Sequence, residues 1–224
     1  MTKYVYMVAA AAAALLIAAP MVPAEAAAAH VLTIGHKGGT AVSRGAVLKS
    51  GLAKTTKATF TIGKMTVKCT SATLTAKVTS NPAASGTAVA RASVTASTLG
   101  KCSVPGVKSI AVAAHNLPYN ATVSAAKGNP VKVSGTSKSK PLSLTATIVV
   151  IGIPKFTCTY TAVSISGKAS NTGNVISFSK QKYTFSKGSN KTLCTSVGKT
   201  ASFSATYGPV TDTSVKGSPK VFVN

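Results

Sequence analysis

Two short segments of the sequence repeat one pattern around a cysteine. GKMTVKCT covers residues 63–70 and GIPKFTCT covers residues 152–159, and in each segment the cysteine follows the glycine by six positions. The residue two positions before the cysteine is apolar in both segments, Val67 in the first and Phe156 in the second. Short loops tolerate small insertions, so a pattern that recurs at nearly constant spacing predicts a duplicated module.

The correspondence between the two segments continues along the chain. Asn81 and Asn171 follow the two cysteines at distances of 12 and 13 residues, in the segments TSNP and ASNT. We therefore predict two modules, residues 27–130 and residues 131–224. A chain of this length can form one large domain or two small ones, and the sequence leaves both arrangements open.

The four cysteines lie at matching positions in the two predicted modules. They are Cys69, Cys102, Cys158 and Cys194, and an even number of cysteines in an exported chain indicates disulfide bonds. Four cysteines allow three pairings. The repeat favours one bond within each module, Cys69–Cys102 and Cys158–Cys194.

The hydrophobic pattern has a period of two residues, which is typical of half-buried antiparallel strands. Turn signals such as SNPAASG, NLPYN and SNTGN recur between the alternating segments, and no amphipathic helix of useful length is apparent. The predicted fold is all-β: a duplicated, antiparallel β-sandwich-like module stapled by disulfides, forming one sandwich or two small ones. The predicted inward residues are Ala72, Leu74, Ala76 and Val78, then Ala88, Ala90, Ala92 and Val94, and finally Phe203, Ala205 and Tyr207.

The N-terminus has the order of a secretory signal peptide. Lys3 precedes an uncharged run over residues 4–19, and the small residues AEA at 24–26 follow two prolines. A membrane-spanning helix needs about 20 apolar residues, so the alternative of an uncleaved anchor is less favoured. We predict a cleaved signal peptide over residues 1–26, a secreted or extracellular protein, and no membrane span in the mature chain.

The charge of the chain is strongly one-sided. It has 25 Lys and Arg residues against two carboxylates, Glu25 and Asp212, for a formal net charge of +23. Such a surface attracts polyanions, and we expect an anionic cell-wall polymer or another polyanion as the partner. The densest stretches of lysine supply the candidate binding residues, which are Lys138, Lys140, Lys180, Lys182, Lys187 and Lys191.

Specific reading of nucleic acid is not expected. Nearly all the basic residues are lysines, whereas bidentate recognition of guanine and phosphate uses arginine. The chain has no Trp and only six Tyr and six Phe, so it lacks the aromatic platforms on which single-stranded bases stack. No zinc-finger or RNA-recognition motif is present.

An enzymatic site is poorly supported by the residue inventory. Glycoside hydrolysis uses two carboxylates, and the predicted mature chain has one. A Ser-His-Asp site would need Asp212 with His30, His36 or His115, and no G-x-S-x-G segment is present. GHKGG at 35–39 is typical of a loop, and LCTSVGKT at 193–200 lacks the first glycine of a phosphate-binding loop. We expect no catalytic residue, no cofactor and no metal site.

The segments AKVTSNPAASGTA, LGKC and NLPYNATVSA, together with the repeated Gly–Cys pattern, resemble a group of uncharacterised secreted actinobacterial proteins. These proteins share a signal peptide, paired cysteines and an NLPY segment. The resemblance covers most of residues 50–210 and implies an exported β-protein without implying an activity. The heavy lysine content of this chain departs from the group.

The sequence therefore favours a non-enzymatic, exported β-protein of the cell envelope or extracellular space that binds anionic polymers through a lysine-rich surface. Two alternatives stay open: a β-sandwich that binds a small ligand or a protein, and a hydrolase with an atypical site. A clustered lysine face would favour the first function. An apolar cavity would favour ligand binding, and a deep cleft containing His115 or Asp212 would favour the hydrolase. The oligomeric state stays open.

Overall fold

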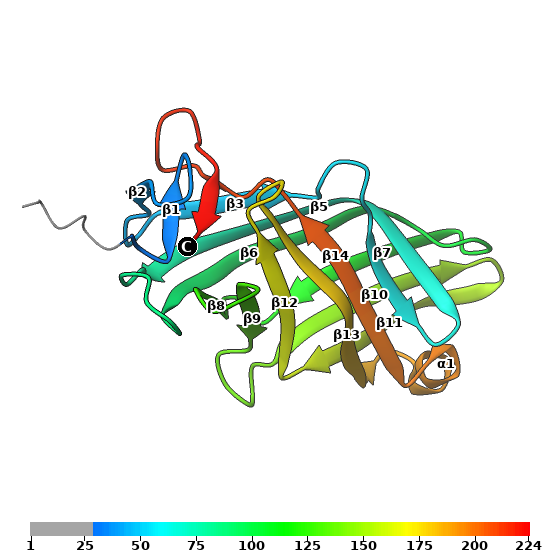
Figure 1. The fold of residues 1–224 in the computed structure, drawn as a ribbon. Helices are drawn as coiled ribbons and strands as arrows, with labels where there is room; N and C mark the ends of the chain where they lie inside the picture. Colours follow the sequence, from blue (N-terminus) through cyan, green and yellow to red (C-terminus); the bar gives the residue numbers. More distant parts are fainter. Residues whose placement is uncertain (1–28) are drawn as a thin grey trace, which may run out of the picture.

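The structure is a computed structural model, and it describes residues 29–224. The predicted signal peptide, residues 1–26, lies outside the described residues. Most of the described residues lie in strands and the regular structure includes one short helix, which confirms the predicted all-β class (Figure 1). The elements are β1 (Leu32–Ile34), β2 (Thr40–Ala41), β3 (Val47–Gly51), β4 (Ala58–Ile62), β5 (Met65–Ser80), β6 (Val89–Ser103), β7 (Ser109–His115), β8 (Tyr119–Ser124), β9 (Pro130–Ser134), β10 (Leu142–Val150), β11 (Ile153–Ala162), β12 (Ser164–Ser170), β13 (Val175–Gly188), α1 (Lys191–Val197), β14 (Thr200–Tyr207), β15 (Thr211–Asp212) and β16 (Val221–Val223).

The main sheet contains 13 strands and closes on itself. Strands β6, β7, β10, β11, β13, β14, β4 and β5 pair in turn, and the β5–β6 pairing completes a ring of eight strands. A sandwich consists of two separate sheets packed face to face. The expected sandwich-like arrangement is therefore not found in that form, because the strands pair continuously around the ring.

A second bridge of strands joins β6 to β13. The first half of β6 pairs with β8, which pairs in turn with β9, β12 and the first half of β13. Register shifts interrupt β5 between Thr75 and Ala76, and β13 between Phe178 and Gln181. Such bulges bend a strand and increase its twist. β6 therefore pairs with β8 along its first half and with β7 further on. β13 pairs with β12 along its first half and with β11 along its second half.

Strands from both predicted modules share this sheet. The β4–β14 and β7–β10 pairings each join a strand of residues 27–130 to a strand of residues 131–224. The predicted boundary after residue 130 falls within β9. One hydrophobic core, which includes Phe60 and Tyr160, contains residues of both halves. The ring centroids of these two residues lie 5.7 Å apart in an edge-to-face arrangement, which is favourable for aromatic pairs.

The alternation of the sequence is confirmed on the three segments that predicted it most clearly. The residues predicted to face inward are buried or half-buried in β5, β6 and β14, and their neighbours on these strands are mostly more exposed. β4 shows the same alternation, with Ala58, Phe60 and Ile62 fully buried. The inward set fills the closed sheet with apolar side chains, which is the main source of stability for a β-protein of this size.

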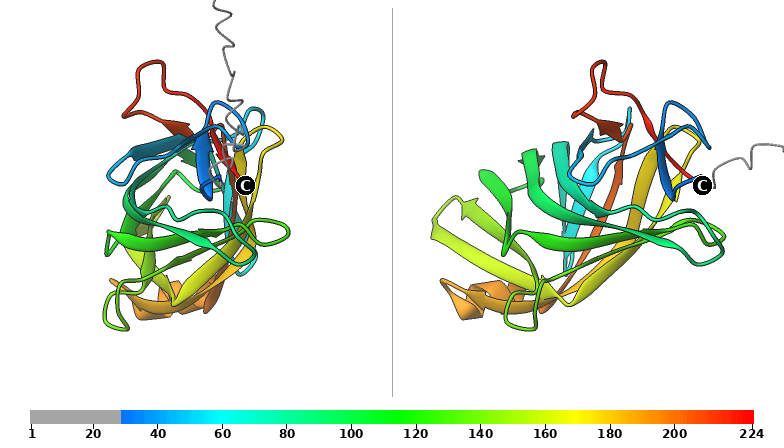
Figure 2. Two further views of the ribbon diagram at one scale, coloured as in Figure 1. Left: turned by 60° about the vertical axis from the view of Figure 1, so that its left-hand side comes forward. Right: turned by 90° about the vertical axis from the view of Figure 1, so that its left-hand side faces the viewer.

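A small sheet of three strands caps one end of the closed sheet. β1 pairs with both β2 and β16, so strands near the two ends of the described chain lie side by side (Figure 2). Val31, Leu32, Val221 and Val223 of this cap pack with Val78 and Ala90 in a second hydrophobic cluster. We call β1, β2 and β16 the cap sheet.

Both predicted disulfides are present. Cys69 and Cys102 face each other across β5 and β6, with their Cα atoms 3.9 Å apart. Cys158 of β11 is bonded to Cys194 of α1, with a Cα–Cα distance of 5.5 Å. The described residues contain no free cysteine.

Candidate functional site

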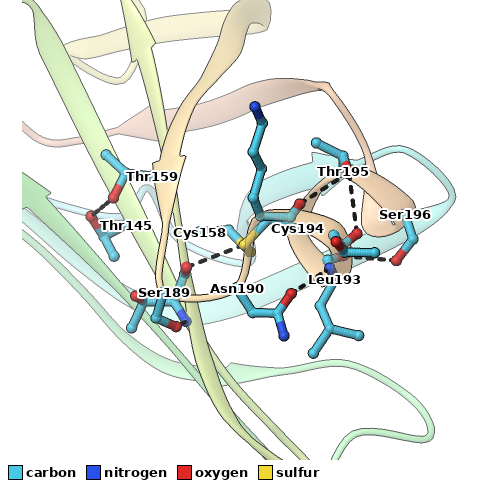
Figure 3. The surroundings of a disulfide bond; sticks show 12 residues. Thr145, Cys158, Thr159, Ser189, Asn190, Leu193, Cys194, Thr195 and Ser196 are labelled. Atoms are coloured by element: carbon cyan, nitrogen blue, oxygen red, sulfur yellow. Dashed lines mark hydrogen bonds between the residues drawn. A yellow bond between two sulfur atoms is a disulfide. The ribbon is translucent and has the colours of Figure 1, made fainter.

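The second disulfide fixes the only helix of the described residues against the sheet. Asn190 caps α1, because its Oδ1 accepts the Leu193 N–H at 3.0 Å (Figure 3). Ser189 continues the pairing of β11 through its N–H and its hydroxyl, which bond to the backbone of Thr157 at 3.0 Å and 2.9 Å. Cys194 is buried and bonded to Cys158. The helix is therefore held at the end of the molecule opposite the cap sheet (Figure 1).

Two glycines bring a distant turn against the end of this helix. Gly63 lies in the β4–β5 turn with a φ of +55°, and a side chain there would collide with the carbonyl oxygen of Val197. A Cβ atom on Gly198 would lie 2.6 Å from the Gly63 nitrogen. The close backbone contact places Lys64 beside Lys199, because each lysine directly follows one of the two glycines.

Two further lysines flank the turn that leads into α1. Lys187 pairs with Thr159 in the β11–β13 register, and Lys191 begins the helix. Both are exposed, as are Lys64 and Lys199. We call these four residues the helix-end lysines. They come from two segments of the chain that are distant in sequence, the turn at residue 64 and residues 187–199.

The other four predicted binding residues lie outside this group. Lys138 and Lys140 occupy the β9–β10 loop, and Lys180 and Lys182 lie on β13 at and just beyond its bulge. All four are exposed. Sequence reasoning thus found Lys187 and Lys191 but missed Lys64 and Lys199, which no dense lysine stretch marks.

The surface carries no carboxylate side chain within residues 29–224. Asp212 is the one acidic residue there, and it is 1% exposed. Its Oδ1 accepts the Ser214 N–H at 2.9 Å, which fixes the turn after β15. Because this carboxylate is buried, the exposed lysines have no acidic side chain beside them on the surface of the described residues.

The interior contains an apolar cavity of about 90 Å³ beneath the cap sheet. Leu32, Val221 and Val223 line it from the cap, and Leu74, Val94 and Phe178 are among the residues that line it from the main sheet. We call it the outer chamber. It is the apolar cavity that the ligand-binding alternative requires.

A second cavity of about 50 Å³, the inner chamber, lies deeper in the closed sheet. Leu74, Val94, Val133 and Phe178 line both chambers, so a single layer of side chains separates them. Three tyrosines also line the inner chamber, Tyr119, Tyr183 and Tyr207. Burial raises the pKa of each of these phenols above its ordinary value, which keeps the hydroxyl groups neutral.

None of the residues considered for hydrolysis, which are Asp212, His30, His36 and His115, lines either chamber. His115 is exposed at the end of β7 and Asp212 is buried in β15. His36 lies in the exposed β1–β2 turn, where its carbonyl oxygen accepts the Gly39 N–H. In residues 29–224 no three His, Cys, Asp or Glu side chains gather as metal ligands would. The part of the chain that the structure describes also has no helix with the length and apolar character needed to cross a membrane.

The comparisons with known proteins yield no match: no family model, no curated protein and no solved structure is similar to this chain. The fold and its surface define a disulfide-bonded, all-β protein with a closed sheet, a basic exterior and an apolar interior cavity.

Proposed function

We propose that this protein is exported and binds anionic polymers of the cell envelope through its lysines. The observation that carries the proposal is the one-sided surface of the described residues, where the one carboxylate is buried while the candidate lysines are exposed. Opposite charges on neighbouring side chains would weaken the attraction for a polyanion. Here no acidic side chain offsets the positive potential of the exposed lysines. This potential extends into the solution over the Debye length, which is about 10 Å at moderate salt.

The helix-end lysines are the preferred binding surface. Lys64 and Lys199 follow the two glycines in contact, and Lys187 and Lys191 flank the neighbouring turn. The disulfide and the helix cap hold these segments in place, so little conformational entropy is lost when a polymer binds. Lysine acts as a hydrated point charge, so the surface selects for charge density rather than for a particular base or sugar.

Export is the second part of the proposal. Its support is the signal-like order of residues 1–26, together with two disulfides, which persist in oxidising compartments. The resemblance to secreted actinobacterial proteins agrees with it. No catalytic role is proposed.

We further propose that the two halves of the chain descend from one duplicated module. Gly63 and Gly152 both occupy turns with positive φ, and each precedes a strand that carries a bridged cysteine. The sequential strand pairings β4–β5 and β10–β11 correspond in this scheme. Asn81 and Asn171 also make equivalent contacts with the cap sheet.

Retention on purified cell wall and on polyphosphate beads, measured as a function of salt, tests the binding function. The four helix-end lysines, each contributing about 0.7 to 0.9 to the slope of log affinity against log salt, would reduce affinity by roughly 10² between 50 and 200 mM salt on a nucleic-acid-like polyanion. Equal retention on a neutral polysaccharide, or retention unchanged in molar salt, would contradict the proposal. Stronger retention on nucleic acid than on cell wall at equal salt would assign a different polyanion.

A second candidate function is the binding of a small ligand. The specific observation in its favour is the apolar outer chamber beneath the cap sheet. The two functions use different parts of the molecule, the exterior and the interior, so each can be tested without the other.

A further inference from the structure

Two of the tyrosines in the inner chamber have hydroxyl groups without a protein partner. Tyr183 is 4% exposed and Tyr207 is 3% exposed. Within residues 29–224 no protein atom forms a hydrogen bond with either hydroxyl. The other two tyrosines of this range do find partners, because Tyr119 donates to the His115 carbonyl oxygen and Tyr160 donates to that of Gly198. Buried hydroxyl groups normally have a hydrogen-bond partner, so two without one at one place require an explanation.

The position of these hydroxyls gives the explanation. Neither hydroxyl oxygen is fully enclosed by protein, because every fully enclosed side-chain nitrogen or oxygen atom of the described residues has a hydrogen-bond partner. Both side chains line the inner chamber.

The wall of the outer chamber is mostly apolar, and Lys49, Arg91 and four Ser or Asn residues also line it. Valine, alanine and leucine side chains dominate the wall of the outer chamber, and no charged residue lines the inner one. Apolar cavities of this kind stay dry, and one of about 150 Å³ binds benzene. The two chambers, at about 90 and 50 Å³, approach that size once the shared layer of Leu74 and Phe178 is displaced.

We propose that the interior binds a small neutral amphiphile with one apolar ring or short chain and one hydroxyl or carbonyl oxygen. The apolar part occupies the outer chamber beneath the cap sheet, and the oxygen atom bonds to the hydroxyls of Tyr183 and Tyr207. A neutral oxygen is favoured over a carboxylate, because a charge buried without a partner is strongly unfavourable and the inner chamber offers no cation.

Phenol and benzene serve as the probes, because they have the same ring and differ by one hydroxyl. Calorimetry on the folded full-length protein should show that both bind. In Tyr183→Phe/Tyr207→Phe the affinity for phenol should fall about tenfold, as expected for two lost hydrogen bonds that become partly replaced by other contacts, while the affinity for benzene stays within about twofold. Phe keeps the ring and its packing, so the variant should fold.

A cavity-filling variant checks the location of the ligand. Ala92 and Ala121 line the outer chamber, and Ala92→Leu or Ala121→Leu should abolish binding of both probes without lowering the melting temperature. Retention on polyanion beads should stay unchanged in all these variants. The proposal is overturned if wild-type protein binds neither probe at millimolar concentration, if the double Phe variant loses phenol and benzene equally, or if a crystal soaked in phenol contains only water in the inner chamber.

Discussion

Asn81 and Asn171 hold two residues that are paired with each other. Asn81 accepts the Leu32 N–H and donates to the Leu32 carbonyl oxygen, both at 2.8 Å. Asn171 makes the same two bonds to Val223, at 2.8 and 2.7 Å. Leu32 and Val223 are opposed at one end of the β1–β16 ladder, so this residue pair of the cap sheet is fixed from both sides.

Removing either amide should loosen the cap sheet. Asn171→Ala leaves a backbone N–H and carbonyl of Val223 without these partners, so we expect a loss of about 1–3 kcal/mol in the free energy of unfolding. Amide hydrogen exchange should accelerate in β1 and β16 before it does in β10 or β11. Asn120→Ala is the matched control, because Asn120 is exposed on β8. Equal effects of the two substitutions would show that the amide of Asn171 contributes little.

The two disulfides should stabilise the fold by similar amounts. They close loops with sequence separations of 33 and 36 residues, and the chain-entropy model gives roughly 3–4 kcal/mol for loops of this length. Cys69→Ala/Cys102→Ala and Cys158→Ala/Cys194→Ala should each lower the free energy of unfolding, measured in urea, by about that amount. A loss of less than about 1 kcal/mol in either variant would be inconsistent with the model.

The tyrosines of the described residues should resist ionisation in the folded protein. Burial raises the pKa of Tyr160 to about 12 and raises those of Tyr183, Tyr207 and Tyr119 as well. In the unfolded chain these groups ionise near pH 10, so above that pH the unfolded state binds fewer protons. Stability should therefore be unaffected by these groups below about pH 10 and should fall as the pH rises above it.

Near-ultraviolet absorbance of tyrosinate measures the fraction of ionised tyrosine directly. A sample that begins after the predicted signal peptide excludes Tyr4 and Tyr6 and contains only these four tyrosines. Its folded form should show almost no tyrosinate at about pH 10.5, whereas the same sample in urea should be more than half ionised. Ionisation of two or more tyrosines near pH 10, with circular dichroism unchanged, would argue against the buried interior.

The strands could be predicted because alternation reports which side chains face inward. Tyr207 was placed on the inward face by this pattern, and it is buried. The pattern does not say which strands pair, however. The β4–β14 and β7–β10 pairings connect segments that are distant in sequence, so closure of the sheet depends on long-range packing that alternation alone does not encode.

The helix α1 was missed because seven residues are too few to show helical periodicity. Its one local signal is Asn190, a preferred N-cap residue. The helix-end lysines were found only in part for a similar reason. Lys64 joins the group through the contact between Gly63 and Gly198, which depends on tertiary structure.

The binding surface can be tested by removing charge at one end of the molecule at a time. One variant carries glutamine at Lys64, Lys187, Lys191 and Lys199. Its matched control carries glutamine at Lys37, Lys127, Lys216 and Lys220, which lie in turns and loops near the cap sheet. Both variants lose the same net charge, so a general field effect would weaken both equally.

The most direct measurement is the slope of log affinity for polyphosphate against log salt, for the wild type and these two variants. Each lysine contact contributes about 0.7 to 0.9 to the slope of a nucleic-acid-like polyanion. The helix-end variant should reduce the magnitude of the slope by about 3, and the cap-end variant should change it by less than about 1. Equal slopes in the two variants would contradict a localised binding surface, and a wild-type slope near zero would contradict polyanion binding altogether.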